Sequence, residues 1–212
     1  MKNRRPTSSL KELLRLFAER SSAIQNRLAD FANVPRNEYF YELVYCLLTP
    51  QSSAVNAGKA VRLLRESDLL HRNVDPEPLL HQKEFYVRFH RTKAHNLLEL
   101  KNRFETVAFH LANASTGSEL REWLVNNVRG LGWKEASHFL RNVGHRDLAI
   151  LDRHILRNLL RFGIIRSIPK TLTRKRYLAI EERFRAFARD VEISMDELDL
   201  LFWSMETGEI LK

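Results

Sequence analysis

The sequence predicts an all-α protein, and three observations support this prediction. Apolar residues recur three and four positions apart, the spacing that lines one face of a helix. Only 7 glycines and 6 prolines interrupt the 212 residues. The alternation of β-branched and polar residues that is typical of strands is missing. We therefore expect helices throughout, joined by short loops.

Five apolar stretches predict helices in chain order. They comprise Leu10, Leu13, Leu14 and Phe17; Phe40, Leu43, Val44 and Leu47; Leu97, Leu98 and Phe104; the run from Trp133 to Val143; and Ile155, Leu156, Leu159 and Leu160. Capping boxes indicate two helix starts, at Ser9 with Glu12 and at Ser194 with Glu197. Three loops are expected, none long enough to link independent domains: 72–78, 114–117 and 163–169.

The composition is that of a globular chain with an excess of positive charge. Its 212 residues are enough for one or two small domains, and 44% of them are hydrophobic. There are 35 lysines and arginines against 26 acidic residues, which gives a formal net charge of +9 at pH 7. Such a charge favours a polyanionic partner, such as a nucleic acid, without identifying it.

The single cysteine and the hydropathy exclude several classes of protein. Cys46 lies in the apolar run 43–48, which predicts a buried thiol in a reducing compartment. One cysteine excludes a four-cysteine iron–sulfur cluster. No apolar run reaches the length of a membrane span, and the first residues lack the apolar core of a secretory signal. We therefore expect a soluble intracellular protein.

The segment 128–134 carries the strongest functional signal. Gly130 and Gly132 flank one apolar residue, so a hairpin can expose several backbone N–H groups, and Arg129 lies beside them. The helix expected next would point its N-terminus at this hairpin, which suits a phosphate. Lys134 leaves the first turn of that helix, where the positive helix end and partial burial favour the neutral amine. A neutral lysine amine is a usable nucleophile.

A purely structural interpretation of these residues is also open. The glycines would then make a tight turn, Lys134 would be a solvated surface lysine, and Asp152 would cap the next helix. The spacing favours function, because Asp152 lies 18 positions after Lys134. That interval leaves room for one helix, a stop at Gly144 and a return of the chain.

Gly130, Gly132, Lys134, Asp152 and His154 together form a pattern: a hairpin of alternating apolar residues and glycines, a lysine two residues later, and an aspartate followed at the second position by histidine. This pattern resembles that of the helix-hairpin-helix DNA glycosylases. The resemblance is narrowed by Leu-Leu-Thr-Pro-Gln at 47–51, Val-Arg-Phe at 87–89 and a terminal lysine, Lys212. These features, and the length, resemble the archaeal-type 8-oxoguanine DNA glycosylase/AP lyases over nearly the whole chain.

The resemblance implies an all-α fold of two helical subdomains that flank a DNA-binding cleft. Residues 36–146 would form a helical barrel that ends in the helix-hairpin-helix motif. Residues 1–35 and 147–212 would form a second helical domain from both termini. Lys134 and Asp152 would then face the cleft from opposite domains.

The resemblance also implies the chemistry of a bifunctional base excision repair enzyme. The damaged nucleotide is flipped out of the duplex, and Lys134 would attack C1′ and form a Schiff base that nicks the strand by β-elimination. Asp152 would stabilise the positive charge that develops on the sugar. No cofactor is expected, and the 8 histidines show no metal-ligand spacing, so no side-chain metal site is expected either.

The same resemblance assigns recognition of the base to four positions. Trp203 would stack on one face, and the terminal carboxylate of Lys212 would accept hydrogen bonds from the purine edge. Phe89 or His90 would stack on the other face. The alternatives are a core tryptophan, a frayed terminal lysine, a packing phenylalanine and a surface histidine.

Two further residues are expected to contact DNA. Gln51 would probe the space left by the flipped base, unless it only caps a helix or forms a turn, and His154 would contact a phosphate or the pocket. The expected partner is double-stranded DNA with 8-oxoguanine or abasic sites, bound by a monomer. A non-enzymatic helix-hairpin-helix module, which has no need of Asp152, and a glycosylase for another damaged base remain alternatives.

Overall fold

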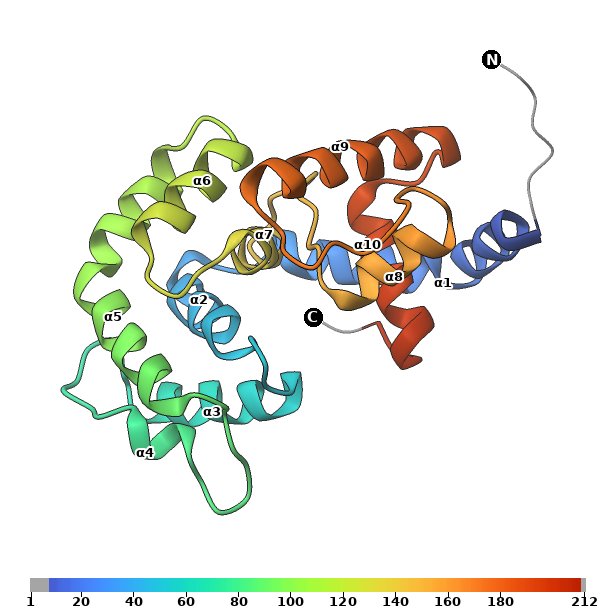
Figure 1. Cartoon of the computed structure of the whole chain (residues 1–212). Helices are drawn as coiled ribbons and strands as arrows, with labels where there is room; N and C mark the ends of the chain where they lie inside the picture. Colours follow the sequence, from blue (N-terminus) through green and yellow to red (C-terminus); the bar gives the residue numbers. More distant parts are fainter. Residues whose placement is uncertain (1–7, 211–212) are drawn as a thin grey trace. The chain divides into compact units, whose positions relative to one another are not determined.

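The computed structural model describes residues 8–210, which form ten α-helices and one short 3₁₀ helix (Figure 1). No strand occurs within this range, where His81 and Tyr86 pair in an isolated antiparallel bridge. The all-α prediction is confirmed. None of the helices in these residues is both long and apolar enough to cross a membrane.

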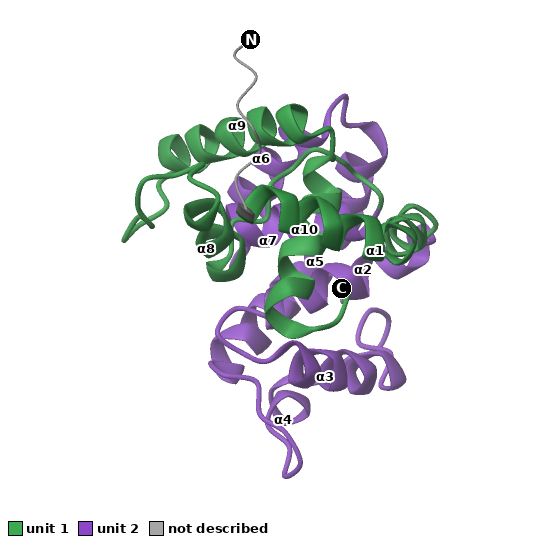
Figure 2. Cartoon of the chain, turned by 90° about the vertical axis from the view of Figure 1, so that its right-hand side faces the viewer, with its two compact units in different colours: residues 1–33, 144–212 green, residues 34–143 purple. Residues whose placement is uncertain are grey.

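The chain divides into two compact units, which Figure 2 colours separately. The central unit is the continuous segment Val34–Val143. The terminal unit combines Met1–Asn33 with Gly144–Lys212, so it is built from two segments far apart in the sequence.

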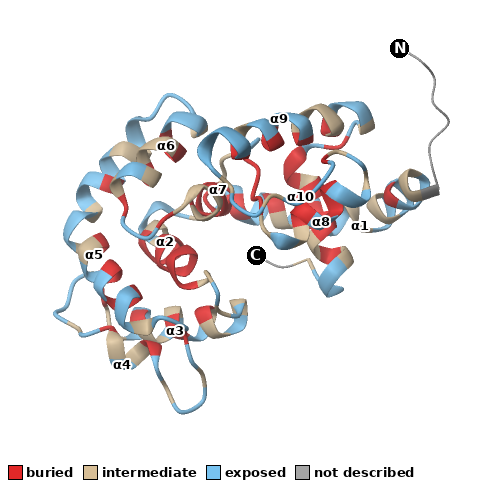
Figure 3. Cartoon of the chain, viewed as in Figure 1, coloured by how far each residue is buried: buried red, intermediate tan, exposed pale blue. Residues whose placement is uncertain are grey.

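The central unit packs around one almost fully buried helix. Its helices are η1 Arg36–Glu38, α2 Tyr39–Leu48, α3 Ala54–Glu66, α4 Glu77–Leu80, α5 His90–Asn113, α6 Gly117–Asn127 and α7 Trp133–Asn142. Every residue of α2 after Tyr39 is buried (Figure 3), because α3, α5 and α7 all pack against it. Cys46 is among them, which confirms the expected buried thiol. A helix that is hydrophobic on nearly all sides is buried, and the one carboxylate in α2, that of Glu42, accepts a hydrogen bond from Nδ2 of Asn142 across 3.2 Å.

The terminal unit packs around its last helix. Its helices are α1 Ser8–Ala32, α8 Arg153–Arg161, α9 Arg174–Val191 and α10 Met195–Thr207. Helix α10 contacts the other three. Phe202 on α10 stacks between Phe162 and Phe184, with ring centroids 5.5 and 5.9 Å away, so aromatic rings fix how α10 meets its neighbours.

Side-chain caps define several helix starts. At the starts of α3, α6 and α9, the side-chain oxygen of the preceding residue accepts a hydrogen bond from the third backbone N–H of the helix. These capping residues are Ser53, Thr116 and Thr173. Ser194 and Glu197 form the predicted capping box at the start of α10. The box expected at Ser9 is wrong, because Ser9 lies inside α1, whose first residue is Ser8.

The connection from α7 to α8 begins with a glycine at which any other residue would be strained. Gly144 has a φ of +92°, and a Cβ there would lie 3.1 Å from the Cα of Ala32 on α1. Arg146 then donates a hydrogen bond of 2.8 Å to the carbonyl of Leu28. The start of this connection is therefore fastened to α1.

Candidate active site

The hairpin expected at 128–132 joins α6 to α7. Leu131 N–H donates to the carbonyl of Val128 across 3.2 Å, which closes the turn. Gly130 has a φ of +85°, and a Cβ there would overlap Nδ2 of Asn96. Gly132 precedes α7 in extended backbone, with φ −90° and ψ 179°. Gly130 is thus required both by its left-handed backbone and by close packing.

Lys134 lies in the first turn of α7, directly after the hairpin. Its side chain is 26% exposed, and Nζ lies 3.3 Å from Oε1 of Glu135. The other oxygen of Glu135 turns back towards the hairpin and would lie 2.8 Å from a Cβ at Gly132. Glu135 is a site residue that the sequence reasoning missed, although an acidic residue in the first turn of a helix is a recognisable signal.

An open hollow lies beside the hairpin, and Arg103 and Arg129 are among the residues that line it. Arg129 donates to Nε2 of His95 and to Oε2 of Glu99 on α5, across 3.1 and 3.4 Å. The hollow has a volume of about 460 Å³ and is lined by Glu99, Arg103 and residues 125–132. The backbone N–H groups at the N-terminus of α7 and the exposed guanidinium of Arg129 are groups of the kind that bind phosphate.

Asp152 is the cap of α8, and both of its carboxylate oxygens accept hydrogen bonds. Oδ1 accepts from the backbone N–H groups of His154 and Ile155, across 2.7 and 2.8 Å. Oδ2 accepts from Nε1 of Trp203 on α10, across 3.1 Å. The capping role that was the structural alternative is therefore present, and it fixes the carboxylate in one orientation.

Trp203 and His154 lie together beside this carboxylate. Their ring centroids are 5.3 Å apart, with the planes tilted by 54°. Nδ1 of His154 lies 3.5 Å from Oε2 of Glu206, one turn further along α10. Trp203 is only partly buried, so the ring is not a simple core residue.

Phe89 and His90 differ sharply in their surroundings. Phe89 has a φ of +60°, which is strained for a bulky residue, and is 49% exposed. His90 packs in an aromatic cluster, with its ring 4.8 Å from that of His81 and 5.6 Å from that of Tyr86. The geometry therefore favours Phe89 as the residue that can stack on a ligand.

Gln51 also has left-handed backbone, with a φ of +55°, in the turn between α2 and α3. This turn is held by Lys93, whose Nζ donates to the carbonyls of Leu48 and Pro50 across 2.7 Å each. Nζ also donates to Oγ of Ser52 across 3.2 Å. A single buried amine thus fixes the conformation on both sides of Gln51.

Lys93 connects this turn to the segment that carries Phe89. Oγ of Ser52 accepts from the backbone N–H of Arg88 across 2.9 Å, so both strained residues share one polar centre. Lys93 is only 6% exposed, and burial lowers its pKa to about 8; the carboxylate of Glu135 opposes this shift and the ammonium of Lys134 adds to it. No local sequence pattern identifies Lys93, since its partners lie more than 40 positions away.

The central unit holds one group of the predicted residues, which comprises Gln51, Phe89, His90, Arg129, Gly130, Gly132 and Lys134. The terminal unit brings the second group together, namely Asp152, His154 and Trp203. Lys212 lies outside the described residues. Within the described part of the chain no histidine, cysteine and carboxylate side chains form a group suited to a metal ion.

Comparisons of the sequence with those of known proteins all point to one family. The profile of the family described as 8-oxoguanine DNA glycosylase matches residues 24–193. The chain is 44% identical to the 8-oxoguanine DNA glycosylase/AP lyase of Fusobacterium nucleatum, across 95% of this chain and 96% of that protein. It is 39% identical to the protein of the same name from Methanocaldococcus jannaschii, across 86% of each.

Solved structures give the same result for the fold. The 8-oxoguanine glycosylase/lyase of Methanocaldococcus jannaschii, crystallised with a 15mer DNA containing 8-oxoguanine, matches with a TM-score of 0.85 and 36% identity, over 95% of this chain and 98% of that chain. The 8-oxoguanine DNA glycosylase of Thermotoga maritima matches with a TM-score of 0.83 and 34% identity, over 95% of this chain and 97% of that chain.

Proposed function

Because this chain belongs to the 8-oxoguanine DNA glycosylase family, we propose that it excises 8-oxoguanine from duplex DNA and then nicks the strand at the abasic site. The observation that carries the proposal is the position of Lys134, whose amine leaves the first turn of α7 directly behind the hairpin. A group that binds the DNA backbone and a nucleophile are thus adjacent in one short segment.

The hairpin binds the phosphate backbone in this proposal. The N–H groups at the start of α7 and the guanidinium of Arg129 supply the contacts, and the net charge of +9 favours approach to the polyanion. The damaged nucleotide leaves the stack, because C1′ of the sugar cannot be reached within the duplex.

The first chemical step joins Nζ of Lys134 to C1′ while the bond from C1′ to N9 of the base breaks. The electron pair leaves with the purine, which is then protonated. Lys134 has to lose a proton, and the carboxylate of Glu135, 3.3 Å from Nζ, can accept it. The carboxylate of Asp152 acts on the same nucleotide by stabilising the positive charge that develops on the sugar.

The second step uses the Schiff base that follows when the bond from C1′ to the ring oxygen opens. The iminium group acidifies the protons on C2′, one of which is removed. The bond from C3′ to its phosphate oxygen then breaks, which nicks the strand on the 3′ side. Each step uses side chains and DNA alone, without a cofactor.

Recognition of the base is assigned to residues from both groups. Trp203 stacks on one face of 8-oxoguanine and the exposed ring of Phe89 on the other. Lys212 contacts the purine edge, Gln51 enters the space left in the duplex, and His154 contacts the flipped nucleotide. We further propose that the enzyme acts as a monomer inside the cell, on its DNA.

Sodium borohydride trapping tests this function. Duplexes with 8-oxoguanine, with dihydrothymine or without a lesion are incubated with wild type and with Lys134→Gln. We expect a covalent product with 8-oxoguanine that is lost in the variant, while binding to an abasic-site analogue remains. Trapping that survives in Lys134→Gln would remove Lys134 as the nucleophile. Binding without any trapped product would favour a non-enzymatic DNA-binding module. Trapping on the dihydrothymine duplex alone would favour a glycosylase for another damaged base.

A further inference from the structure

The chain that leads to Asp152 has no regular secondary structure, although its second half is deeply buried. It runs from Gly144 to Asp152, between α7 and α8, and residues 148–151 are all buried. Buried backbone outside a helix needs hydrogen-bond partners, because an unpaired N–H or carbonyl group is costly there.

One face of α9 supplies most of these partners. Arg185 donates from Nε to Oδ2 of Asp147 across 2.7 Å and from Nη2 to its carbonyl across 3.0 Å. Glu181 accepts from the N–H of Ala149 through Oε2, across 2.8 Å. These two residues of α9 therefore hold two alternate residues of the connection.

Tyr177 continues the same series towards Asp152. Its hydroxyl donates to the carbonyl of Ala149 across 2.5 Å and accepts from the N–H of Leu151 across 3.3 Å. Tyr177 and Glu181 are almost fully buried, so water does not compete for these bonds. We call Tyr177, Glu181 and Arg185, with their bonds to residues 147, 149 and 151, the α9 ladder.

The ladder works because two repeats have nearly the same length. Tyr177, Glu181 and Arg185 lie four residues apart, which is about 6 Å along a helix. Alternate residues of an extended chain are roughly 6.5 Å apart and face the same side. A helix face and an extended chain that run in opposite directions can therefore stay in register over three steps.

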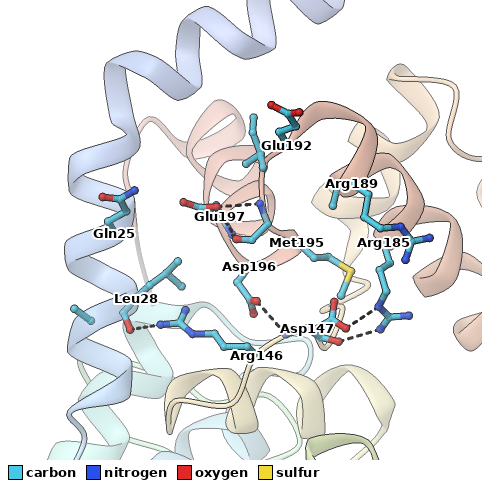
Figure 4. Close-up of a pocket in the computed structure, with 14 residues that line it drawn as sticks. Gln25, Leu28, Arg146, Asp147, Arg185, Arg189, Glu192, Met195, Asp196 and Glu197 are labelled. Atoms are coloured by element: carbon cyan, nitrogen blue, oxygen red, sulfur yellow. Dashed lines mark hydrogen bonds and ion pairs between the residues drawn. The ribbon is translucent and has the colours of Figure 1, made fainter. Parts of the chain in front are cut away.

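The far end of the ladder is also held from α10. Asp147 has a φ of +63°, and its N–H donates to Oδ2 of Asp196 across 3.0 Å. Figure 4 shows Asp147 between Asp196 on one side and Arg185 on the other, at the edge of a pocket whose arginines and carboxylates lie largely paired. This end of the connection is thus fixed at backbone and side chain together.

The near end passes directly into Asp152. The N–H of Asp152 donates to the carbonyl of Ile150 across 2.7 Å, and the carboxylate then caps α8. Asp152 directly follows Leu151, the last residue that the ladder holds. A displacement of Ala149 or Leu151 therefore moves the carboxylate.

We propose that Tyr177, Glu181 and Arg185 are positioning residues for excision. They hold residues 147, 149 and 151 and thereby set the position of the Asp152 carboxylate. The proposal rests on the function given above. A misplacement of about 1 Å in a catalytic group can reduce a rate on the order of 100-fold.

The first test compares substitutions on and beside the ladder. Glu181→Leu removes the acceptor for the N–H of Ala149 and leaves an apolar side chain of similar size. Glu181→Gln supplies an amide oxygen that can accept the same hydrogen bond. Ile180→Ala is the matched control, since Ile180 is buried on α9 and outside the ladder. Single-turnover excision of 8-oxoguanine should fall about 10- to 100-fold in Glu181→Leu and stay near the wild-type rate in the other two. Equal losses in Glu181→Leu and Ile180→Ala, or no rescue by glutamine, would overturn the proposal.

A double-mutant cycle tests whether the effect passes through Asp152. In an Asp152→Asn background the carboxylate charge is already gone, so Glu181→Leu should reduce excision little further. The same fold-loss in both backgrounds would show that Glu181 acts by another route and would contradict the proposal.

A measurement without substrate separates this proposal from the proposed function. Nε1 of Trp203 donates to Asp152, so its indole NMR signal reports the position of the carboxylate. The signal, assigned through Trp203→Phe, should shift in Glu181→Leu and stay in place in Ile180→Ala. If the signal does not move in Glu181→Leu, the positioning role of the ladder is rejected. If wild type excises no 8-oxoguanine, the proposed function is rejected, and the NMR signal still tests the positioning role.

Discussion

The indole Nε1 of Trp203 donates a hydrogen bond of 3.1 Å to Oδ2 of Asp152. The backbone N–H groups of His154 and Ile155 occupy the other oxygen, Oδ1. The ring proposed to stack on the base is therefore bonded to the carboxylate proposed to stabilise the sugar cation. A displacement of the ring would therefore act directly on that carboxylate.

Trp203→Phe separates the two roles of this ring. Phenylalanine keeps an aromatic face but loses the N–H donor to Asp152. We expect excision of 8-oxoguanine to slow by about tenfold or more, the effect of losing one hydrogen bond to a charged group. Single-turnover excision measures this. Trp123→Phe on α6 is the control, and an equal loss there would contradict a specific role for the indole.

Asp152→Asn should separate stability from catalysis. Asparagine is as good a helix cap as aspartate, so the free energy of unfolding should change little, whereas excision should fall by on the order of 100-fold or more because the charge is lost. Asp152→Ala removes the cap as well and should cost about 1 kcal/mol of stability. Urea unfolding and single-turnover excision give the two quantities. Excision by Asp152→Asn at the wild-type rate would reject an electrostatic role.

Gly130→Ala tests the requirement for glycine in the hairpin. The left-handed backbone and the overlap with Asn96 should cost roughly 1–3 kcal/mol and weaken binding to an abasic-site duplex. Gly58→Ala is a control with the opposite sign. Gly58 lies within α3 with nothing within 4 Å of an added Cβ, so alanine should stabilise the protein by about 0.5–1 kcal/mol. Unaltered DNA affinity in Gly130→Ala would argue against the hairpin as the contact.

Lys93→Met should change how stability depends on pH. The pKa of Lys93 is lowered by burial from 10.5 to about 8, so above pH 8 the unfolded chain holds this proton more tightly than the folded one. Raising the pH from about 8 towards 10 therefore stabilises wild type relative to Lys93→Met, by up to about 1.4 kcal/mol per pH unit. Urea unfolding at several pH values measures the difference.

Lys93→Arg is the partner variant for this experiment. Arginine stays charged over the whole range, so it should lose the pH-dependent gain while keeping a donor for the turn around Gln51. If wild type and both variants gain stability in parallel as the pH rises, the gain does not come from Lys93.

The features that could be predicted from the sequence are those that depend on residues close together in the chain. The hairpin glycines, the Ser194 capping box and the cap at Asp152 depend on residues within a few positions, and each has a recognisable pattern. Lys93 and Tyr177 have no such pattern, because their partners come from 26 to 45 positions away. Their roles depend on which helices meet, and hydrophobic spacing alone does not determine that.

Helix α1 and helix α10 complete one unit although they lie near opposite ends of the chain. Nη1 of Arg20 on α1 donates to Oγ of Ser204 on α10 across 2.7 Å, and the two helices pack together. During translation, at about 5–20 residues per second, the central unit emerges whole while α1 waits on the order of ten seconds or longer for α10. The apolar face of α1, with Leu13 and Ile24, lacks its partner helix during this interval. The nascent chain thus carries a surface that chaperones can bind until its last helix leaves the ribosome.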